Sequence, residues 1–368
     1  MKITFIIPRA DTSGGVRVVS IYAKRLRERG HDVVVISRPH RAATMRERLR
    51  TKISGRPLPY AARKVPSLMD GLGVDHRQID SHRAITASDV PDADVVIATW
   101  WETAEWAANY PASKGAKVYF LQHHEVHEGI PADRVDATWR LPMHKIVIAN
   151  WLADMAKNRF GDADYSLVPN SVDTSQFYAP PRDKQPAPTL GVMYSHVPFK
   201  GCDISLRAFA LAQKKIPALK LVSFGNRAPT AELPLPAGAD FICQPPQDAI
   251  RDIYSRADAW LFASRSEGFG LPILEAMACR TPVIATPAGA APELISPGGG
   301  ILVPPENPMA MAEAIEKMCA MDSPTWRAMS DKAHETATSY SWDDAAALFE
   351  AALIRAREKS STNADSRN

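Results

Sequence analysis

The sequence predicts an α/β protein with two domains, each built on a parallel β-sheet that helices cover on its faces. The chain has 368 residues, which is more than one ordinary domain core contains, so about two domains are expected. Short apolar runs alternate with amphipathic stretches in both halves, as in β-α-β units. A proline-rich segment at residues 178–188 separates the halves and is typical of a linker.

The clearest β-α-β unit opens the chain. An apolar run at residues 3–8 predicts a strand, and apolar side chains follow at helical spacing through residues 16–29. Gly30 occupies the usual position of a helix C-cap, and residues 33–36 predict the next buried strand. In the rest of this half we predict a helix at 151–160 and strands at 95–98, 117–122, 145–149 and 165–168.

The C-terminal half repeats the alternation. Strands are predicted at 190–194, 219–224, 240–243, 259–263 and 282–285, and helices at 202–213, 248–255 and 271–279. The predicted domains are therefore residues 1–178 and 188–340. A last helix is expected at 342–357, within a C-terminal segment 341–358, and the polar tail 359–368 is expected to be disordered.

Composition excludes several classes of protein. A formal net charge of +3 is too small to suggest a nucleic-acid partner. The four cysteines are widely spaced and predict neither a disulfide framework nor a zinc site, which fits a reducing cytosol. The sequence contains no secretory signal and no apolar run long enough to span a bilayer. We therefore expect a cytoplasmic protein whose membrane contact, if any, is peripheral.

The most informative segment is residues 264–275, SRSEGFGLPILE. A buried strand precedes it, and a helix is expected to begin after Gly270. Gly268 and Gly270 allow backbone N–H groups to approach a ligand closely, and a helix N-terminus attracts anions. Glu267 and Glu275 can each accept two hydroxyl hydrogen bonds, which suits a sugar or a ribose. The pattern predicts a diphosphate site at the carboxyl end of a strand; the alternative is a capped helix with a surface glutamate.

Residues 267–283, EGFGLPILEAMACRTPV, resemble the motif EGFGLPxLEAMAxGxPV of glycosyltransferase family 4, whose members are retaining enzymes with the GT-B fold. The resemblance implies two Rossmann-like domains that face each other across a cleft, with the donor mainly on the C-terminal one. It implies that Glu267 holds hydroxyls of the donor sugar and that Glu275 holds the ribose. The backbone from Phe269 to Leu271 would contact the sugar and the diphosphate.

Further matches extend the resemblance. The family's glycine loop, which closes over the donor, corresponds to Gly14 and Gly15. Its phosphate-binding lysine corresponds to Lys200, a mobile point charge suited to a diphosphate. The remaining matches are residues 168–173 with Phe177, 288–293, 300–304 and the Ser341-Trp342 pair, where the family's final helix begins and crosses back to the N-terminal domain.

The chain departs from the family pattern at two places. The arginine that usually precedes the lysine is replaced by Ser195, with His196 beside it. Either His196 or an arginine elsewhere, such as Arg227, would supply the second charge, and Gly225 joins these donor-binding candidates. Arg280 replaces a common glycine.

The family's catalytic histidine also has no single counterpart. Gln122 stands at the most direct match, followed by His123 and His124, so either histidine is a catalytic candidate and the alternative is a solvent-facing loop. Gln122 is grouped with the acceptor-binding candidates. The others are Trp100 and Trp101, whose rings suit stacking on sugars or, equally, core packing.

Other signals point away from metal chemistry. Residues 123–127, HHEVH, lack the spacing of H-E-x-x-H, and the D-x-D at Asp92 and Asp94 lies in a turn, where aspartates are common. We expect no metal and no cofactor besides the nucleotide-sugar substrate.

Residues 38–64 contain nine Lys or Arg and one acid, Glu47. This composition is suited to an anionic membrane surface or a phosphate-bearing acceptor, or it is a solvated mobile loop.

The resemblance thus implies a hexosyltransferase (EC 2.4). It would transfer a hexosyl or deoxyhexosyl group from a nucleotide-diphosphate sugar to a hydroxyl of a glycan or lipid-linked acceptor. The setting implied is bacterial polysaccharide, lipopolysaccharide or glycolipid biosynthesis. Two alternatives stay open: a nucleotide-sugar epimerase or hydrolase on the same double-domain plan, and a non-catalytic nucleotide-sugar-binding protein.

Overall fold

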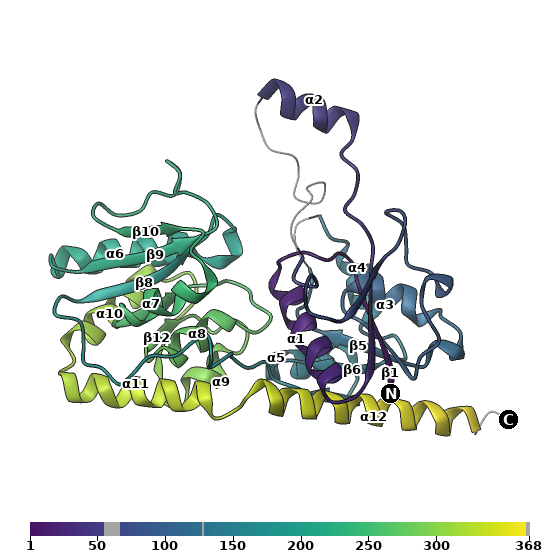
Figure 1. Ribbon diagram of the computed structural model, residues 1–368. Coiled ribbons are helices and arrows are strands. Elements are labelled where there is room, and N and C mark those ends of the chain that lie inside the picture. Colours follow the sequence, from purple (N-terminus) through teal and green to yellow (C-terminus); the bar gives the residue numbers. More distant parts are fainter. Residues whose placement is uncertain (55–66, 127–128, 366–368) are drawn as a thin grey trace. The chain divides into compact units, whose positions relative to one another are not determined.

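The structure, a computed structural model, describes residues 1–54, 67–126 and 129–365. The chain forms two compact units (Figure 1). The first comprises Met1–Ile148, Leu152–Pro169 and Asp343–Asn368, and the second Ala149–Trp151 and Asn170–Trp342. Each unit contains one parallel sheet flanked by helices, so the predicted two-domain α/β class is confirmed.

The sheet of the first unit has seven strands in the order β3-β2-β1-β4-β5-β6-β7. Every pairing is parallel, with Ile3 facing Val33 on one side and Val95 on the other. The central strands read as apolar runs because helices bury both of their faces. The bounds are β1 (Lys2–Ile7), β2 (Asp32–Ser37), β3 (Asp75–Gln78), β4 (Val95–Ala98), β5 (Ala116–Leu121), β6 (His144–Val147) and β7 (Tyr165–Leu167).

Helices of the first unit include three for which the sequence analysis gave no helix range, α2, α3 and α4. The bounds are α1 (Gly14–Glu28), α2 (Met45–Ser54), α3 (Trp101–Ala108), α4 (Ala132–Thr138), α5 (Asn150–Asp154) and α12 (Trp342–Asp365), with short turns at Ala87–Asp89, Ala112–Lys114 and Met155–Arg159. No helix in the described part of the chain combines the length and the apolar character needed to cross a membrane.

Helix α12 completes the core of the first unit. Its Phe349 stacks on Tyr22 with ring centroids 4.2 Å apart and meets Phe120 edge-on at 5.0 Å. Its Glu350 accepts hydrogen bonds from Arg29 and His31, each at 2.7 Å. The expected disorder of residues 359–368 is wrong for 359–365, which continue this helix and pair Lys359 with Asp164. Residues 366–368 lie outside the described residues.

The second unit has a six-stranded parallel sheet in the order β10-β9-β8-β11-β12-β13. Its strands are β8 (Thr189–Tyr194), β9 (Lys220–Gly225), β10 (Asp240–Cys243), β11 (Ala259–Phe262), β12 (Val283–Ala285) and β13 (Gly300–Leu302). Its helices are α6 (Cys202–Lys215), α7 (Ile250–Ser255), α8 (Leu271–Ala278), α9 (Ala291–Ile295), α10 (Pro308–Ala320) and α11 (Ser323–Thr338), with short turns at Pro198–Lys200 and Gln247–Ala249.

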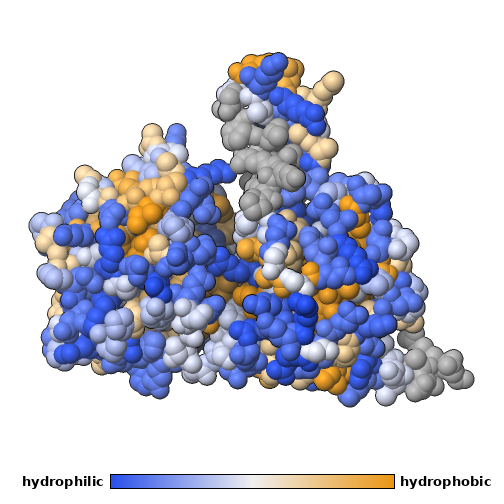
Figure 2. All heavy atoms as spheres, in the orientation of Figure 1, coloured by the Kyte–Doolittle hydropathy of each residue, from blue (hydrophilic) through white to orange (hydrophobic). Residues whose placement is uncertain are grey.

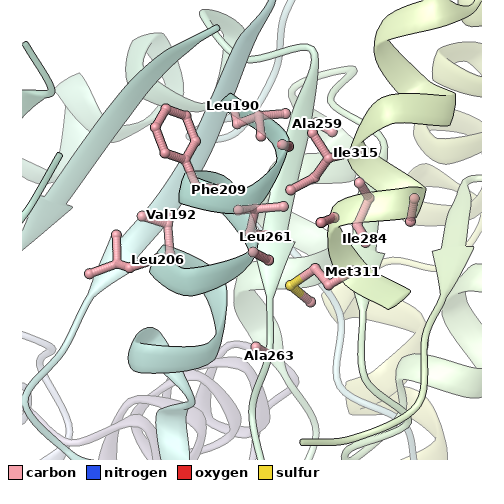
Figure 3. Close-up of a cluster of buried hydrophobic side chains, with 14 of the residues drawn as sticks. Leu190, Val192, Leu206, Phe209, Ala259, Leu261, Ala263, Ile284, Met311 and Ile315 are labelled. Atoms are coloured by element: carbon pink, nitrogen blue, oxygen red, sulfur yellow. The ribbon is translucent and has the colours of Figure 1, made fainter. Parts of the chain in front are cut away.

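One hydrophobic core lies between this sheet and helices α6 and α10 (Figure 3). Leu261 of β11 and Ile284 of β12 point toward Phe209 of α6 and Ile315 of α10, and all four side chains are at most 2% exposed. Burying a side chain of this size contributes about 1.5–3 kcal/mol. This packing holds the strands whose carboxyl ends carry the candidate site.

The proline-rich segment 178–188 is not a free linker. Lys184 donates hydrogen bonds to the carbonyls of Cys319 and Met321 at 2.6 and 2.9 Å, and the Arg182 guanidinium lies 4.6 Å from the Trp326 ring centroid. These contacts fasten the segment to the second unit. The boundary between units therefore falls after Pro169, ahead of the position that composition predicted.

Candidate active site

The site of the second unit forms where two loops meet at the carboxyl edge of its sheet. One loop leaves β8 and carries Lys200; the other leaves β11 and leads into α8. Gly201 brings them together, since its φ is +61° and a Cβ there would lie 1.8 Å from the carbonyl oxygen of Ala263. Only glycine tolerates both the conformation and the close approach.

Lys200 and Glu267 form an ion pair at this junction. The Lys200 ammonium lies 2.7 Å from Oε1 and 2.9 Å from Oε2 of Glu267. The Ser264 hydroxyl donates to the same Oε1 at 2.8 Å, and Thr286 in turn donates to the carbonyl of Ser264 at 2.5 Å. Glu267 and Ser264 are buried. Two predicted site residues are thus in direct contact, and Ser264, for which the sequence analysis assigned no role, orients one of them.

Arg265 ties the two loops together from the outside. Its backbone N–H donates to the Phe199 carbonyl at 2.8 Å, and its guanidinium bonds both carboxylate oxygens of Asp203 at 2.9 Å. The hydrogen bond from Arg265 lowers the pKa of Asp203. This bidentate pair holds the start of α6 against the loop that carries Glu267.

In the donor loop, residues 267–271, the backbone carbonyls of residues 268–270 accept hydrogen bonds from the protein and the N–H groups of residues 268–271 make none within the described part of the chain. The carbonyl of Gly268 accepts from the indole of Trp151 at 2.8 Å, that of Phe269 from Ala290 N–H at 2.8 Å, and that of Gly270 from Ile273 N–H at 2.9 Å. In the described structure, the N–H groups of residues 268–271 donate to no protein acceptor. Consecutive free N–H groups at a helix N-terminus form an anion-binding site.

Two glycines shape this loop. Gly270 is the N-cap of α8 with φ +99°, a left-handed conformation that side chains rarely adopt. Gly289, after β12, packs against the loop: a Cβ there would lie 2.6 Å from the Phe269 carbonyl oxygen and 2.9 Å from Cβ of Glu267. The segment 288–293 that matched the family pattern therefore supports the donor loop from behind.

Glu275 lies on the first turns of α8, eight residues beyond Glu267. Its Oε2 accepts a hydrogen bond at 2.8 Å from the hydroxyl of Tyr254, which is fully buried on α7. Glu275 is half-buried. A carboxylate accepts several hydrogen bonds at once, so the contact with Tyr254 is compatible with further hydrogen bonds from the hydroxyls of a ribose.

The candidate replacements for the missing arginine lie at the carboxyl ends of β8 and β9. Gly225 faces Tyr194 in the sheet register, and a Cβ on Gly225 would lie 2.6 Å from the Tyr194 carbonyl oxygen. Just beyond these strand ends, His196 Nε2 lies 3.2 Å from the carbonyl of Ala228. Arg227 is exposed and forms no ion pair within the described residues, whereas Ser195 accepts from Val197 N–H at 3.2 Å. Arg227 is thus the available positive charge at this edge.

The candidates of the first unit gather at the carboxyl edge of its own sheet. Gly14 and Gly15 open α1, and no atom lies within 4 Å of a Cβ placed on Gly14. The amide of Gln122, just after β5, donates to the Gly15 carbonyl at 3.2 Å. Gln122 and the glycine loop are therefore in contact.

The two candidate histidines have different surroundings. His124 Nε2 lies 2.9 Å from a carboxylate oxygen of Asp136, and its ring packs edge-on against Trp139 at 5.8 Å. His123 is half-buried, and its Nδ1 lies 2.7 Å from the His124 carbonyl. His124 thus lies against a carboxylate and a core aromatic ring, and His123 against a backbone carbonyl.

The two adjacent tryptophans, Trp100 and Trp101, also differ in their surroundings. Trp101 is buried at the start of α3, with Arg134 4.6 Å from its ring centroid, whereas Trp100 is half-buried. The backbone N–H of Trp101 donates at 2.9 Å to the carboxylate of Glu125, and burial raises the pKa of Glu125 well above its ordinary value. Core packing is thus the observed role of Trp101. Sequence spacing had no signal for the buried role of Glu125.

No group of three or more histidine, cysteine or acidic side chains in the described part of the chain is arranged to hold a metal ion. His127, the last residue of the metal-like HHEVH segment, lies outside the described residues.

The loops at the carboxyl edge of the second unit's sheet lie within a stretch of the chain that matches a family model. Residues 180–336 match the family model of the glycosyl transferases group 1. Over this stretch, which is less than half of the chain, the protein is similar to the group 1 glycosyltransferases. The match covers the Lys200 loop, the donor loop and Glu275, and it leaves residues 1–179, Trp151 included, outside.

Curated relatives match this chain over part of their length. The D-inositol 3-phosphate glycosyltransferase of Streptomyces bingchenggensis is 40% identical over 102 residues, which are 27% of this chain and 22% of the relative. The enzyme of that name from Mycobacterium leprae (strain Br4923) is 32% identical over 175 residues, 43% of this chain and 40% of the relative. The chain thus spans well under half the length of these relatives.

Solved structures resemble the whole chain. Anabaena Alr3699/HepE in complex with UDP-glucose has a TM-score of 0.69 at 17% identity, covering 98% of this chain and 100% of HepE. Sucrose-phosphate synthase from Thermosynechococcus elongatus has a TM-score of 0.69 at 18% identity, covering 96% and 98%. WaaG, a glycosyltransferase involved in lipopolysaccharide biosynthesis, has a TM-score of 0.67 at 16% identity, covering 96% of this chain and 99% of WaaG. At these identities the likeness establishes the shared fold, the GT-B fold expected from the sequence.

Proposed function

We propose that the chain is a retaining glycosyltransferase. It transfers a hexosyl or deoxyhexosyl group from a nucleotide-diphosphate sugar to a hydroxyl of a glycan or lipid-linked acceptor, in bacterial polysaccharide, lipopolysaccharide or glycolipid biosynthesis. The observation that carries the proposal is the row of unoccupied N–H groups at residues 268–271, beside the Lys200–Glu267 pair. These groups supply the positive potential that a diphosphate requires.

The same groups account for the chemistry. As the bond between the sugar and the diphosphate breaks, negative charge grows on the leaving phosphate. The Lys200 ammonium, the loop N–H groups and the N-terminal end of α8 stabilise that charge. The acceptor hydroxyl attacks from the same face of the sugar, and its proton passes to the leaving phosphate oxygen. Because these fixed positive groups stabilise the diphosphate, we propose that transfer needs no metal ion.

The site residues divide the donor between them. Glu267 binds hydroxyls of the sugar, Glu275 binds the ribose, and Arg227 or His196 adds the second positive charge. HepE was solved with UDP and with UDP-glucose, so UDP is the first nucleotide to test here. The glycine loop at Gly14 and Gly15, with His123, belongs in this proposal to the donor-closing and catalytic groups of the first unit.

A panel experiment tests the proposal. The thermal midpoint of the chain is measured with UDP, GDP, dTDP and ADP and with their hexose and deoxyhexose conjugates. A bound nucleotide raises the midpoint by mass action. NMR of the product then reports the anomeric configuration, which is retained if the proposal is correct. Binding without transfer or slow donor hydrolysis would indicate a non-catalytic binding protein, and sugar interconversion without an acceptor an epimerase.

We also propose that α2 docks the protein at an anionic membrane surface, on the cytoplasmic side. None of its side chains is buried, and Met45, Leu49 and Ile53 are 89%, 58% and 77% exposed. Figure 2 shows hydrophobic surface along α2. At helical spacing these three form one stripe. Arg46 and Arg50 flank one side of the stripe, and Arg48 and Lys52 flank the other. An isolated helix of this length is marginal in water, so an apolar and anionic surface would stabilise it.

Vesicle sedimentation tests this second proposal. We expect the protein to co-sediment with phosphatidylglycerol vesicles at low salt and to remain in solution with phosphatidylcholine vesicles. Leu49→Asp together with Ile53→Asp should abolish co-sedimentation while leaving donor turnover on a soluble acceptor unchanged. If the wild-type protein stays in solution with anionic vesicles, α2 is a solvated helix. Residues 55–64 of the basic segment lie outside the described residues.

A further inference from the structure

The donor loop depends on a residue that lies outside the matched domain. Trp151 is the second residue of α5, and it belongs with Ala149 and Asn150 to the second unit. Its indole N–H donates to the carbonyl of Gly268 at 2.8 Å. The two residues are 117 positions apart in the sequence.

We propose that Trp151 is a positioning residue for the donor loop: its indole N–H fixes the Gly268 carbonyl and so aims the N–H of Phe269 at the bound diphosphate. The inference rests on the proposed nucleotide-sugar site. It adds a residue that neither the motif nor the family match contains.

Peptide geometry carries the argument. The Gly268 carbonyl and the Phe269 N–H belong to one planar unit, and in a trans peptide they point in opposite directions. No cis peptide bond occurs among the described residues. Holding the Gly268 carbonyl on the Trp151 indole therefore turns the Phe269 N–H in the opposite direction, away from Trp151. The same reasoning applies to the Phe269 carbonyl, held by Ala290, and the N–H of Gly270.

The loop needs such anchors because its glycines leave the backbone free to rotate. Gly268 and Gly270 flank the two peptide units concerned, and a glycine crosses between backbone conformations at little steric cost. Without a donor for the Gly268 carbonyl, the peptide between Gly268 and Phe269 could turn its oxygen toward the diphosphate. A carbonyl oxygen facing an anion would oppose binding.

Trp151 is itself held in place. The N–H of its neighbour Asn150 donates to Oε1 of Glu293 at 2.9 Å. Glu293 lies on α9, which begins directly after Ala290, the residue that holds the Phe269 carbonyl. The segment 149–151, the donor loop and the start of α9 are thus joined by three hydrogen bonds into one support.

A pair of tryptophan substitutions tests the proposal. Trp151→Phe removes the N–H and keeps an aromatic ring. Trp326→Phe is the matched control, since its indole donates to the Asp258 carbonyl at 2.9 Å in the same unit. The dissociation constant of the nucleoside diphosphate that binds the wild-type protein is measured by calorimetry, and KM for its sugar conjugate by turnover.

We expect Trp151→Phe to raise the dissociation constant of the nucleoside diphosphate by about three- to tenfold. KM for the sugar conjugate should rise by a similar factor, and kcat should change less. Trp326→Phe should lower the thermal midpoint by about 2–4 °C and leave the dissociation constant unchanged. Unchanged affinity in a folded Trp151→Phe protein would overturn the proposal. Should that variant not fold, Glu293→Ala replaces it, with a smaller loss of affinity expected and unchanged affinity again overturning the idea. If the wild-type protein binds no nucleoside diphosphate, the proposed function fails instead.

Discussion

The ammonium of Lys200 contacts both carboxylate oxygens of Glu267, at 2.7 and 2.9 Å, although the residues are 67 positions apart. Glu267 is 9% exposed, so each charge depends on the other for compensation. A group that loses its partner in such surroundings costs about 1–3 kcal/mol. Both side chains are therefore expected to contribute to the stability of the fold as well as to the proposed chemistry.

The first prediction follows from this pairing. Lys200→Met should lower the free energy of unfolding by about 1–3 kcal/mol, because it leaves the Glu267 carboxylate buried and unpaired. The double variant Lys200→Met with Glu267→Gln should recover much of that loss and stay inactive in transfer. Urea denaturation of the two single variants and the double variant measures the coupling. Additive losses would show that the ion pair contributes nothing to the fold.

The second prediction separates the two glutamates. Glu275→Ala should weaken nucleoside diphosphate binding by about 10- to 100-fold, as expected for a charged hydrogen-bond partner, whereas Glu267→Ala should chiefly lower kcat. Tyr254→Phe removes only the hydroxyl that orients Glu275, so its effect on affinity should be smaller. Calorimetry and steady-state kinetics on the three variants check the order. Equal losses of affinity in both glutamate variants would contradict these roles.

The third prediction concerns the support behind the donor loop. Gly289→Ala should destabilise the protein by about 2–4 kcal/mol and weaken diphosphate binding, because the new Cβ would collide with the Phe269 carbonyl and Glu267. Gly238→Ala is the matched control: its φ is +78° and nothing lies within 4 Å of the added atom. That control should cost about 1–2 kcal/mol and leave affinity unchanged. Thermal unfolding and calorimetry distinguish the two.

The fourth prediction concerns acid. His144 on β6 is buried, its Nδ1 has no hydrogen-bond partner, and burial lowers its pKa to about 4. Nearby Asp164 opposes this shift, and Arg355 and Lys359 add to it. Between pH 6.5 and 4 the unfolded chain therefore binds a proton that the folded chain does not, so stability falls as pH falls.

Between pH 7 and 5, the wild-type protein should accordingly lose about 2 kcal/mol more stability than His144→Gln, which carries no titrating group. Urea unfolding of both proteins at the two pH values provides the comparison. Parallel losses would mean that His144 becomes protonated in the folded state at its ordinary pKa.

Much of the architecture could be predicted because burial leaves a local pattern. The central strands, such as β1 and β11, are short apolar runs, and α1 carries its apolar residues at helical spacing. Strand β3 escaped prediction because it is a polar edge strand, with sequence DHRQ and no fully buried residue. The proline-rich segment 178–188 was predicted to be a linker, but Lys184 and Arg182 bind it to the second unit. Their partners lie far along the chain, so no local pattern indicates these contacts.

The local sequence by itself determined the chemical inventory of the site: a glycine-bearing turn before a helix, two glutamates with seven residues between them, and a lysine in an earlier β-α loop. Tertiary structure alone decided which of these groups meet. Strand order and register bring Lys200, after β8, onto Glu267, after β11. The packing of residues 149–151 into the second unit brings Trp151 onto Gly268. The physical reason is the different distance along the chain over which the two kinds of interaction act. Propensity and spacing act within a few turns of chain, whereas contacts between distant loops exist only once sheet pairing and core packing have placed both strand ends at one edge.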